Sequence, residues 1–216
     1  MTSIVFVGGS KGGSGKTSTA HLACLGATLR NHPAAYVLTD PDRKVRGEGR
    51  PYGVLDGRYP DKLAQILAAS HSSLNGWLFI DGGGNRQAFD QEIAAEADLC
   101  VLPFKASEED LDTVATDMQR LPKAVAWPTA WPTNPHAERA AQFYIDGLRQ
   151  AFPGRVITPP IPFVNSVSDL LASTLESPST ATRQLGRKVF RVIEDWFIYH
   201  IDEAKDLDDG PRAVVA

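Results

Sequence analysis

The sequence predicts an α/β protein: one domain built on a doubly wound, mostly parallel sheet that is flanked by helices. The main observation is that short apolar runs rich in β-branched residues alternate along the chain with longer segments of helical periodicity. The second is the length of 216 residues, which suits a single compact domain. We expect that domain to span residues 1–205, with a flexible acidic tail over residues 206–216.

Strands are predicted where several β-branched, aromatic or other apolar residues follow one another and a turn residue ends the run. These runs lie at residues 3–7, 35–39, 77–80, 99–103 and 124–131, and a final short strand begins at residues 156–157. The first run leads into two glycines, and Asp40-Pro41 ends the second. Two prolines, Pro128 and Pro132, make the fifth run irregular.

Helices are predicted where apolar residues recur every three or four positions. These segments lie at residues 17–30, 61–70, 107–121, 136–152 and 180–201. Acidic residues at the start of the third segment favour a helix there, because they face the positive end of the helix dipole. The polar stretch at residues 42–60 is rich in Gly and Arg, and we expect an exposed, mobile loop there.

Composition and charge exclude several classes of protein. The formal net charge is −4, so a contact with nucleic acid requires a local cluster of basic residues instead of a global basic field. No apolar run approaches the roughly 20 residues that span a bilayer, and no positive region precedes the first apolar run as in a signal peptide. Both cysteines, Cys24 and Cys100, lie inside apolar runs, so we expect buried thiols in a reducing cytoplasm.

One motif carries most of the chemistry. Residues 11–17 read KGGSGKT, directly after the first predicted strand and at the start of the first predicted helix. Glycines let a loop curl tightly enough to aim backbone N–H groups at phosphates, while Lys16 reaches the outer phosphates and the Thr17 hydroxyl binds Mg²⁺. The predicted nucleotide-binding residues of this loop are Gly12, Gly13, Ser14, Gly15, Lys16, Thr17 and Ser18.

The loop departs from the general phosphate-loop pattern in one respect. Ser10 stands where that pattern has a glycine, and Lys11 directly precedes the paired glycines. The resulting KGGxGKT arrangement resembles the deviant P-loop of the ParA/MinD family of ATPases. This resemblance implies ATP and Mg²⁺ as cofactors. It also implies a homodimer that forms with ATP, because the family's extra lysine, here Lys11, reaches the phosphates of the partner's nucleotide.

Further segments resemble the same family up to about residue 115. Residues 38–41 (LTDP) match its Asp-x-Asp-Pro pattern, with Asp40 at the acid near the attacking water and Leu38 in place of the first acid. Residues 77–81 (WLFID) resemble a Walker B strand, which implies that Asp81 holds Mg²⁺ through water and that Gly82, Gly83 and Gly84 form a switch loop. Residues 98–103, followed by a serine, resemble a third segment of the family. An Asn after a later strand helps to hold adenine in the family, and Asn134 is the candidate here.

The resemblance implies a slow ATPase in which Lys11, Lys16 and Asp40 act in catalysis, serving plasmid or chromosome partition or cargo positioning. Such proteins bind DNA without sequence preference and release it when a ParB-like or other adaptor stimulates hydrolysis, which places this chain in the bacterial cytoplasm, at the nucleoid. The predicted final helix offers a DNA-binding face opposite its apolar stripe, formed by Arg183, Arg187, Lys188 and Arg191. An ordinary solvated helix face explains these residues equally well, and Glu194 and Asp195 nearby weaken the DNA interpretation.

Other functions remain open. A role in conjugative DNA transfer uses the same core, and a metabolic P-loop synthetase or kinase with a small-molecule substrate uses the same phosphate loop. A membrane switch like MinD is disfavoured because the C-terminal segment is acidic and lacks large apolar residues. An electron-transfer protein like nitrogenase reductase is excluded by the placement of Cys24 and Cys100 inside a helix and a strand.

Overall fold

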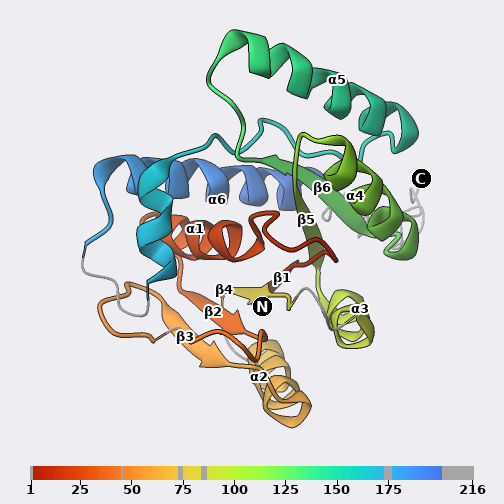
Figure 1. Ribbon diagram of the computed structural model, residues 1–216. Helices are drawn as coiled ribbons and strands as arrows, with labels where there is room; N and C mark the ends of the chain where they lie inside the picture. Colours follow the sequence, from red (N-terminus) through yellow and green to blue (C-terminus); the bar gives the residue numbers. More distant parts are fainter. Residues whose placement is uncertain (1, 45, 73–74, 84–86, 173–176, 201–216) are drawn as a thin grey trace, which may run out of the picture.

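The computed structural model describes residues 2–44, 46–72, 75–83, 87–172 and 177–200. In this part of the chain, one sheet has the strand order β3-β2-β4-β1-β5-β6, and every neighbouring pair is parallel (Figure 1). The strands are β1 (Ser3–Val7), β2 (Ala34–Leu38), β3 (Gly53–Asp56), β4 (Trp77–Asp81), β5 (Leu99–Lys105) and β6 (Ala124–Thr129). The predicted fold class is therefore confirmed.

Helices cover both faces of the sheet (Figure 1). One face carries α1 (Lys16–Thr28), the 3₁₀ helix η1 (Asn165–Leu171) and α6 (Thr180–His200). The other carries α2 (Pro60–Ser72), α3 (Gln87–Glu96), α4 (Glu108–Arg120) and α5 (Pro135–Ala151). Alternate residues of β1 feed the two layers: Val5 and Val7 pack on the first, Ile4 and Phe6 on the second.

The layer of α1 and α6 depends on a close approach of the two helices. A Cβ atom at Gly26 would collide with the backbone carbonyl group of Gly186, so the helices touch through glycines. Nearer the C-terminal end of α6, Phe190 and Phe197 contact the ring of Trp77 edge-on, with ring centroids 5.0 Å and 4.9 Å away. The final helix is thereby fixed over the start of β4.

Two local predictions are corrected by the structure, and one helix was missed. Residues 42–60 do not form a wholly exposed loop, because Arg50 and Tyr52 are buried and Gly53–Asp56 form the edge strand β3. This strand has four residues and alternates exposed with half-buried positions, so it produces no apolar run. Helix α3 was not predicted. In place of a final strand at residues 156–157, there is only an isolated bridge between Ala126 and Val156.

Two further predictions concern the cysteines and the strand that contains Pro128. Cys24 and Cys100 are free and buried, and β6 is an edge strand, which accommodates Pro128. No helix in the described ranges combines the length and the apolar character that crossing a bilayer requires. The expected acidic tail at residues 206–216 and the last residue of the predicted final helix lie outside these ranges.

Candidate nucleotide site

The phosphate loop connects the end of β1 to the start of α1, at the carboxyl edge of the sheet. Gly13 and Gly15 have φ angles of 72° and 102°, a left-handed conformation that side chains other than glycine adopt rarely. No atom of the described residues lies within 4 Å of a Cβ placed at Gly12 or Gly13, so the loop is open on that side. The loop and the N-terminus of α1 together form a site suited to an anion.

Two other elements hold the loop in place. The backbone N–H and the hydroxyl of Ser10 each donate a 2.6 Å hydrogen bond to the carboxylate of Asp117 on α4, which also pairs with Arg120 at 2.8 Å. On the opposite side, the Thr129 hydroxyl at the end of β6 donates to the carbonyl oxygen of Ser14 at 2.7 Å. Ser10 thus uses its side chain as an anchor, which the glycine of the general pattern lacks.

A cavity of about 390 Å³ lies over the loop. Among its lining residues are Gly13, Lys16, Thr17, Asp40 and Arg43. The structure therefore brings Lys16, Thr17 and Asp40 to one cavity, whose described lining does not include Asp81. Lys16 is buried, which lowers the pKa of its ammonium group while Asp81 opposes this shift, and its Nζ donates to the Lys11 carbonyl oxygen at 2.7 Å. Sequence patterns gave no signal for Arg43, which donates from Nε to Asp40 Oδ2 at 3.1 Å.

Asp81 ends β4 and is almost fully buried. Its Oδ2 accepts a 2.6 Å hydrogen bond from the Tyr36 hydroxyl, and its Oδ1 is buried without a hydrogen-bond partner among the described residues. Burial raises the pKa of this carboxyl group, and the hydroxyls of Tyr36 and Thr17 oppose that shift. A buried carboxylate oxygen with free lone pairs close to Thr17 fits Mg²⁺, which prefers oxygen ligands and retains several waters.

Lys11 points away from the phosphate cavity of its own chain. Its ammonium group forms an ion pair with Glu109 and lies 4.0 Å from Asp110 Oδ1, both in the first turn of α4. The side chain is 30 % exposed, and Lys11 is not among the residues found to line the phosphate cavity. Its predicted contact with a second nucleotide stays a prediction.

In the proposed switch loop, Gly82 lines the cavity and Gly84 lies outside the described residues.

A second cavity of about 450 Å³ continues from the phosphate loop and offers space for a nucleoside. Ser18, Lys105, Thr129 and Asn165 are among its lining residues. Asn134, the predicted adenine contact, is not one of them: its side chain caps the start of α5 by accepting from the His136 N–H at 2.9 Å. The role of Asn134 stays a prediction, and Asn165, the first residue of η1, is the asparagine that lines this cavity among the described residues.

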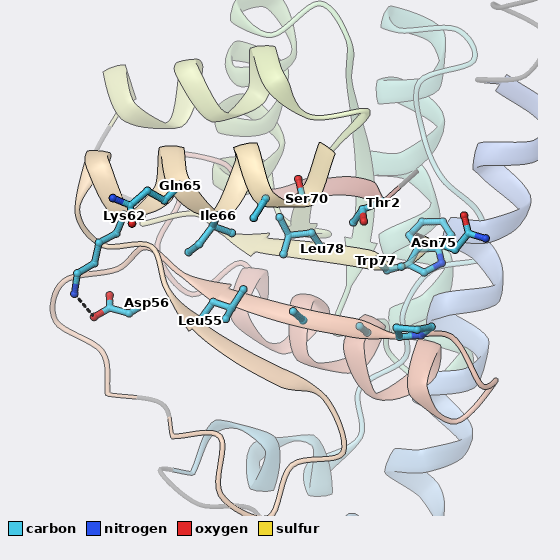
Figure 2. A pocket seen from close by; sticks show the side chains of 15 residues that line it. Thr2, Leu55, Asp56, Lys62, Gln65, Ile66, Ser70, Asn75, Trp77 and Leu78 are labelled. Atoms are coloured by element: carbon cyan, nitrogen blue, oxygen red, sulfur yellow. Dashed lines mark ion pairs between the residues drawn. The ribbon is translucent and has the colours of Figure 1, made fainter. Parts of the chain in front are cut away.

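Another cavity lies elsewhere, beside β2 and α2 (Figure 2). It has a volume of about 710 Å³ and is lined mainly by apolar side chains such as Ile66, Trp77 and Leu78. Lys62 and Asp56 face each other at one end, 3.9 Å apart. No phosphate-loop residue contributes to its described lining, so we do not assign it to the nucleotide.

The predicted DNA-binding residues lie on α6. Arg183, Arg187, Lys188 and Arg191 are all exposed. Arg191 Nε lies 3.7 Å from Asp195 Oδ2, an exposed pair of little energetic weight. The exposure of these side chains leaves them accessible, and a role in binding DNA stays a prediction.

Solved structures with this architecture include McdA from Cyanothece, with a TM-score of 0.63 and 14% identity over 89% of this chain and 100% of that one. A putative plasmid partition protein from Borrelia burgdorferi B31, bound to AMPPNP, has a TM-score of 0.60 and 11% identity over 90% and 99%. This chain has the fold of the ParA/MinD-type P-loop ATPases. Cobyrinic acid a,c-diamide synthase from Mycobacterium smegmatis, with bound ADP and magnesium, matches the same fold at a TM-score of 0.62 and 14% identity over 92% and 96%.

No protein-family model and no curated protein sequence matches the chain. At these levels of identity, the ParA/MinD-type fold explains where the phosphate loop and Asp81 lie, and the residues themselves must carry any argument about activity.

A buried polar network extends from Asp81 away from the phosphate loop. The ring of His21 stacks on Tyr36 with centroids 4.0 Å apart, and His21 Nδ1 lies 3.0 Å from the Tyr52 hydroxyl. Arg50 donates from Nη1 to the same hydroxyl at 2.9 Å and to the carbonyl oxygen of Leu170 at 3.0 Å. The segment of residues 42–52 is thereby connected to η1 through the interior.

His21 makes the stability of the folded protein depend on pH. Burial, with the nearby charges of Arg50 and Arg43, lowers the pKa of His21 to about 3, so the folded protein keeps the ring neutral. The unfolded chain takes up a proton below pH about 6.5, and we expect the free energy of unfolding to fall by about 2 kcal/mol between pH 7 and pH 5 from this residue alone. Urea titrations of wild type and His21→Phe check this. Between pH 7 and pH 5, the free energy of unfolding should fall less in His21→Phe than in wild type. An equal fall in both proteins would contradict a neutral, buried His21.

Proposed function

We propose that the protein is an ATPase that forms a dimer with ATP, hydrolyses it slowly and serves plasmid or chromosome partition or the positioning of another cargo. The observation that carries this proposal is the convergence of Lys16, Thr17 and Asp40 on one cavity while Lys11 points outward from it. An outward lysine beside the phosphate loop is available to a second protomer. ATP and Mg²⁺ are the proposed ligands, and the nucleotide-bound structures of the same fold support this choice.

In this proposal, the phosphate loop and Lys16 bind and orient the phosphates, and Thr17 and Asp81 hold Mg²⁺. The metal ion supplies charge neutralisation at the phosphate oxygens when it is bound. Asp40 orients the attacking water and is itself held by Arg43. Lys11 of each protomer contacts the nucleotide of the other after it leaves Glu109. The exposed basic face of α6 binds DNA without sequence preference, and an activating adaptor, ParB-like or of another kind, ends the cycle in the bacterial cytoplasm.

The first test measures dimerisation by light scattering and binding to random-sequence duplex DNA, with ATP, with ADP and without nucleotide. Wild type should dimerise and bind DNA only with ATP. Lys11→Ala should still bind ATP yet stay monomeric, whereas Lys16→Ala should lose ATP binding. An Arg183/Arg187/Arg191 triple alanine variant should dimerise without binding DNA. The logarithm of the DNA-binding constant should fall linearly with the logarithm of the salt concentration, with a slope of about −0.9 per phosphate contact.

A metabolic synthetase or kinase is the second candidate, because cobyrinic acid a,c-diamide synthase shares the fold to the same degree. ATP turnover that depends on a small molecule, and not on DNA or a protein, would favour it over the switch. Dimerisation with ATP without DNA binding at low salt would count against the nucleoid as the carrier. A function in conjugative transfer predicts the same dimerisation, and only the identity of the cargo separates it from partition.

A further inference from the structure

The strand β2 contributes the hydroxyl of Tyr36 to the expected metal site. Leu38, at the position of the family's first acid, is buried among apolar side chains. Two residues earlier on the same face, Tyr36 is fully buried and donates its hydroxyl hydrogen bond to Asp81 Oδ2 at 2.6 Å. Tyr36 and Asp81 are therefore a contact between neighbouring strands, since β2 and β4 pair in parallel with Leu38 opposite Asp81.

We propose that Tyr36 is a positioning residue for Asp81: its hydroxyl holds Oδ2 and thereby leaves Oδ1 to bind a water of the magnesium ion. The inference rests on the proposed function in so far as it requires a magnesium nucleotide. The direction of the hydrogen bond is fixed, because a carboxylate only accepts and the phenol must donate.

The tyrosine is itself held by a stacked ring and by the pairing of its strand with β4. His21 from α1 stacks on one face of the ring, with centroids 4.0 Å apart and an interplanar angle of 15°. A residue that is locked in this way keeps the carboxylate in one orientation before any ligand arrives. Partners of metal-binding groups that orient them in this manner typically change metal affinity by roughly 10- to 100-fold when they are removed.

The alternative is that Tyr36 is a core residue, and that its hydrogen bond to Asp81 only satisfies a buried hydroxyl. In that case, removal of the hydroxyl lowers stability but does not change how nucleotide binding depends on Mg²⁺. The control variant is Tyr52→Phe, which removes a buried hydroxyl of the same network that does not contact Asp81.

The experiment titrates a fluorescent ADP analogue into the full chain, first in EDTA and then over a series of Mg²⁺ concentrations. In Tyr36→Phe, we expect unchanged metal-free affinity and a Mg²⁺ midpoint raised roughly 10- to 100-fold. In Tyr52→Phe, we expect the wild-type midpoint. A wild-type midpoint in Tyr36→Phe would overturn the inference, and so would equal loss of affinity with and without the metal.

A second pair of variants guards against a Tyr36→Phe protein that fails to fold. Asp81→Asn removes the buried charge. Adding Tyr36→Phe to this variant therefore leaves no buried carboxylate without its hydrogen-bond donor. The two proteins should have equal Mg²⁺ dependence, because the hydroxyl acts only through Asp81, and a further shift would overturn the inference. If wild type bound the analogue in neither condition, the proposed function would fail. If wild type responded to Mg²⁺ and Tyr36→Phe matched it, only this inference would fail.

Discussion

Gly26→Ala is expected to lower the free energy of unfolding by about 3 kcal/mol, because the new methyl group has no space that a rotamer change could create. The atoms in its way belong to the backbone of Gly186 and to the Cβ of Phe190. Relief therefore requires that α1 and α6 move apart, which opens the layer that buries Leu185, Val189 and Phe190. The gain in helix propensity, about 0.5–1 kcal/mol, offsets only part of this cost.

Gly147→Ala is the matched control. Gly147 is also inside a helix, but it is exposed and no atom lies within 4 Å of a Cβ placed there, among the described residues. This variant should gain about 0.5–1 kcal/mol. Chemical denaturation of both variants measures the difference. Equal stability of Gly26→Ala and wild type would mean that the two helices do not touch at these glycines.

Asp117→Ala is expected to lower the free energy of unfolding by about 2–3 kcal/mol and to weaken nucleotide binding. The substitution removes the acceptor of both Ser10 hydrogen bonds and leaves Arg120 without its buried counter-ion. The phosphate loop then loses its anchor on α4, so part of the binding energy must be spent on ordering it. Urea unfolding and a nucleotide titration measure the two effects.

Asp112→Ala provides the comparison on the same helix, because Asp112 is exposed. We expect its stability to stay within about 0.5 kcal/mol of wild type, with unchanged nucleotide affinity. Ser10→Gly, which restores the residue of the general phosphate-loop pattern, should show a smaller loss than Asp117→Ala because Arg120 keeps its partner. Nucleotide affinity in Asp117→Ala equal to that of wild type would show that α4 does not anchor the loop.

Sequence patterns predicted the fold and the phosphate loop because both are encoded locally. The segment at residues 11–17 contains its own glycines, lysine and threonine, and its flanking strand and helix are continuous in the sequence. Short, continuous apolar runs predicted β1, β2, β4, β5 and β6 close to their observed bounds. The short edge strand β3 has only one neighbour and little buried surface, so four residues gave no comparable signal.

The sequence by itself determined that a phosphate loop follows the first strand, that Asp40 follows the second predicted strand and Asp81 ends the third, and that helices alternate with strands. Only the tertiary structure decided which side chains hold these groups in place. Tyr36 and Asp81 are 45 positions apart, and Ser10 and Asp117 are 107 apart. Hydrogen bonds over such separations depend on how strands and helices pack, and local periodicity contains no information about that packing.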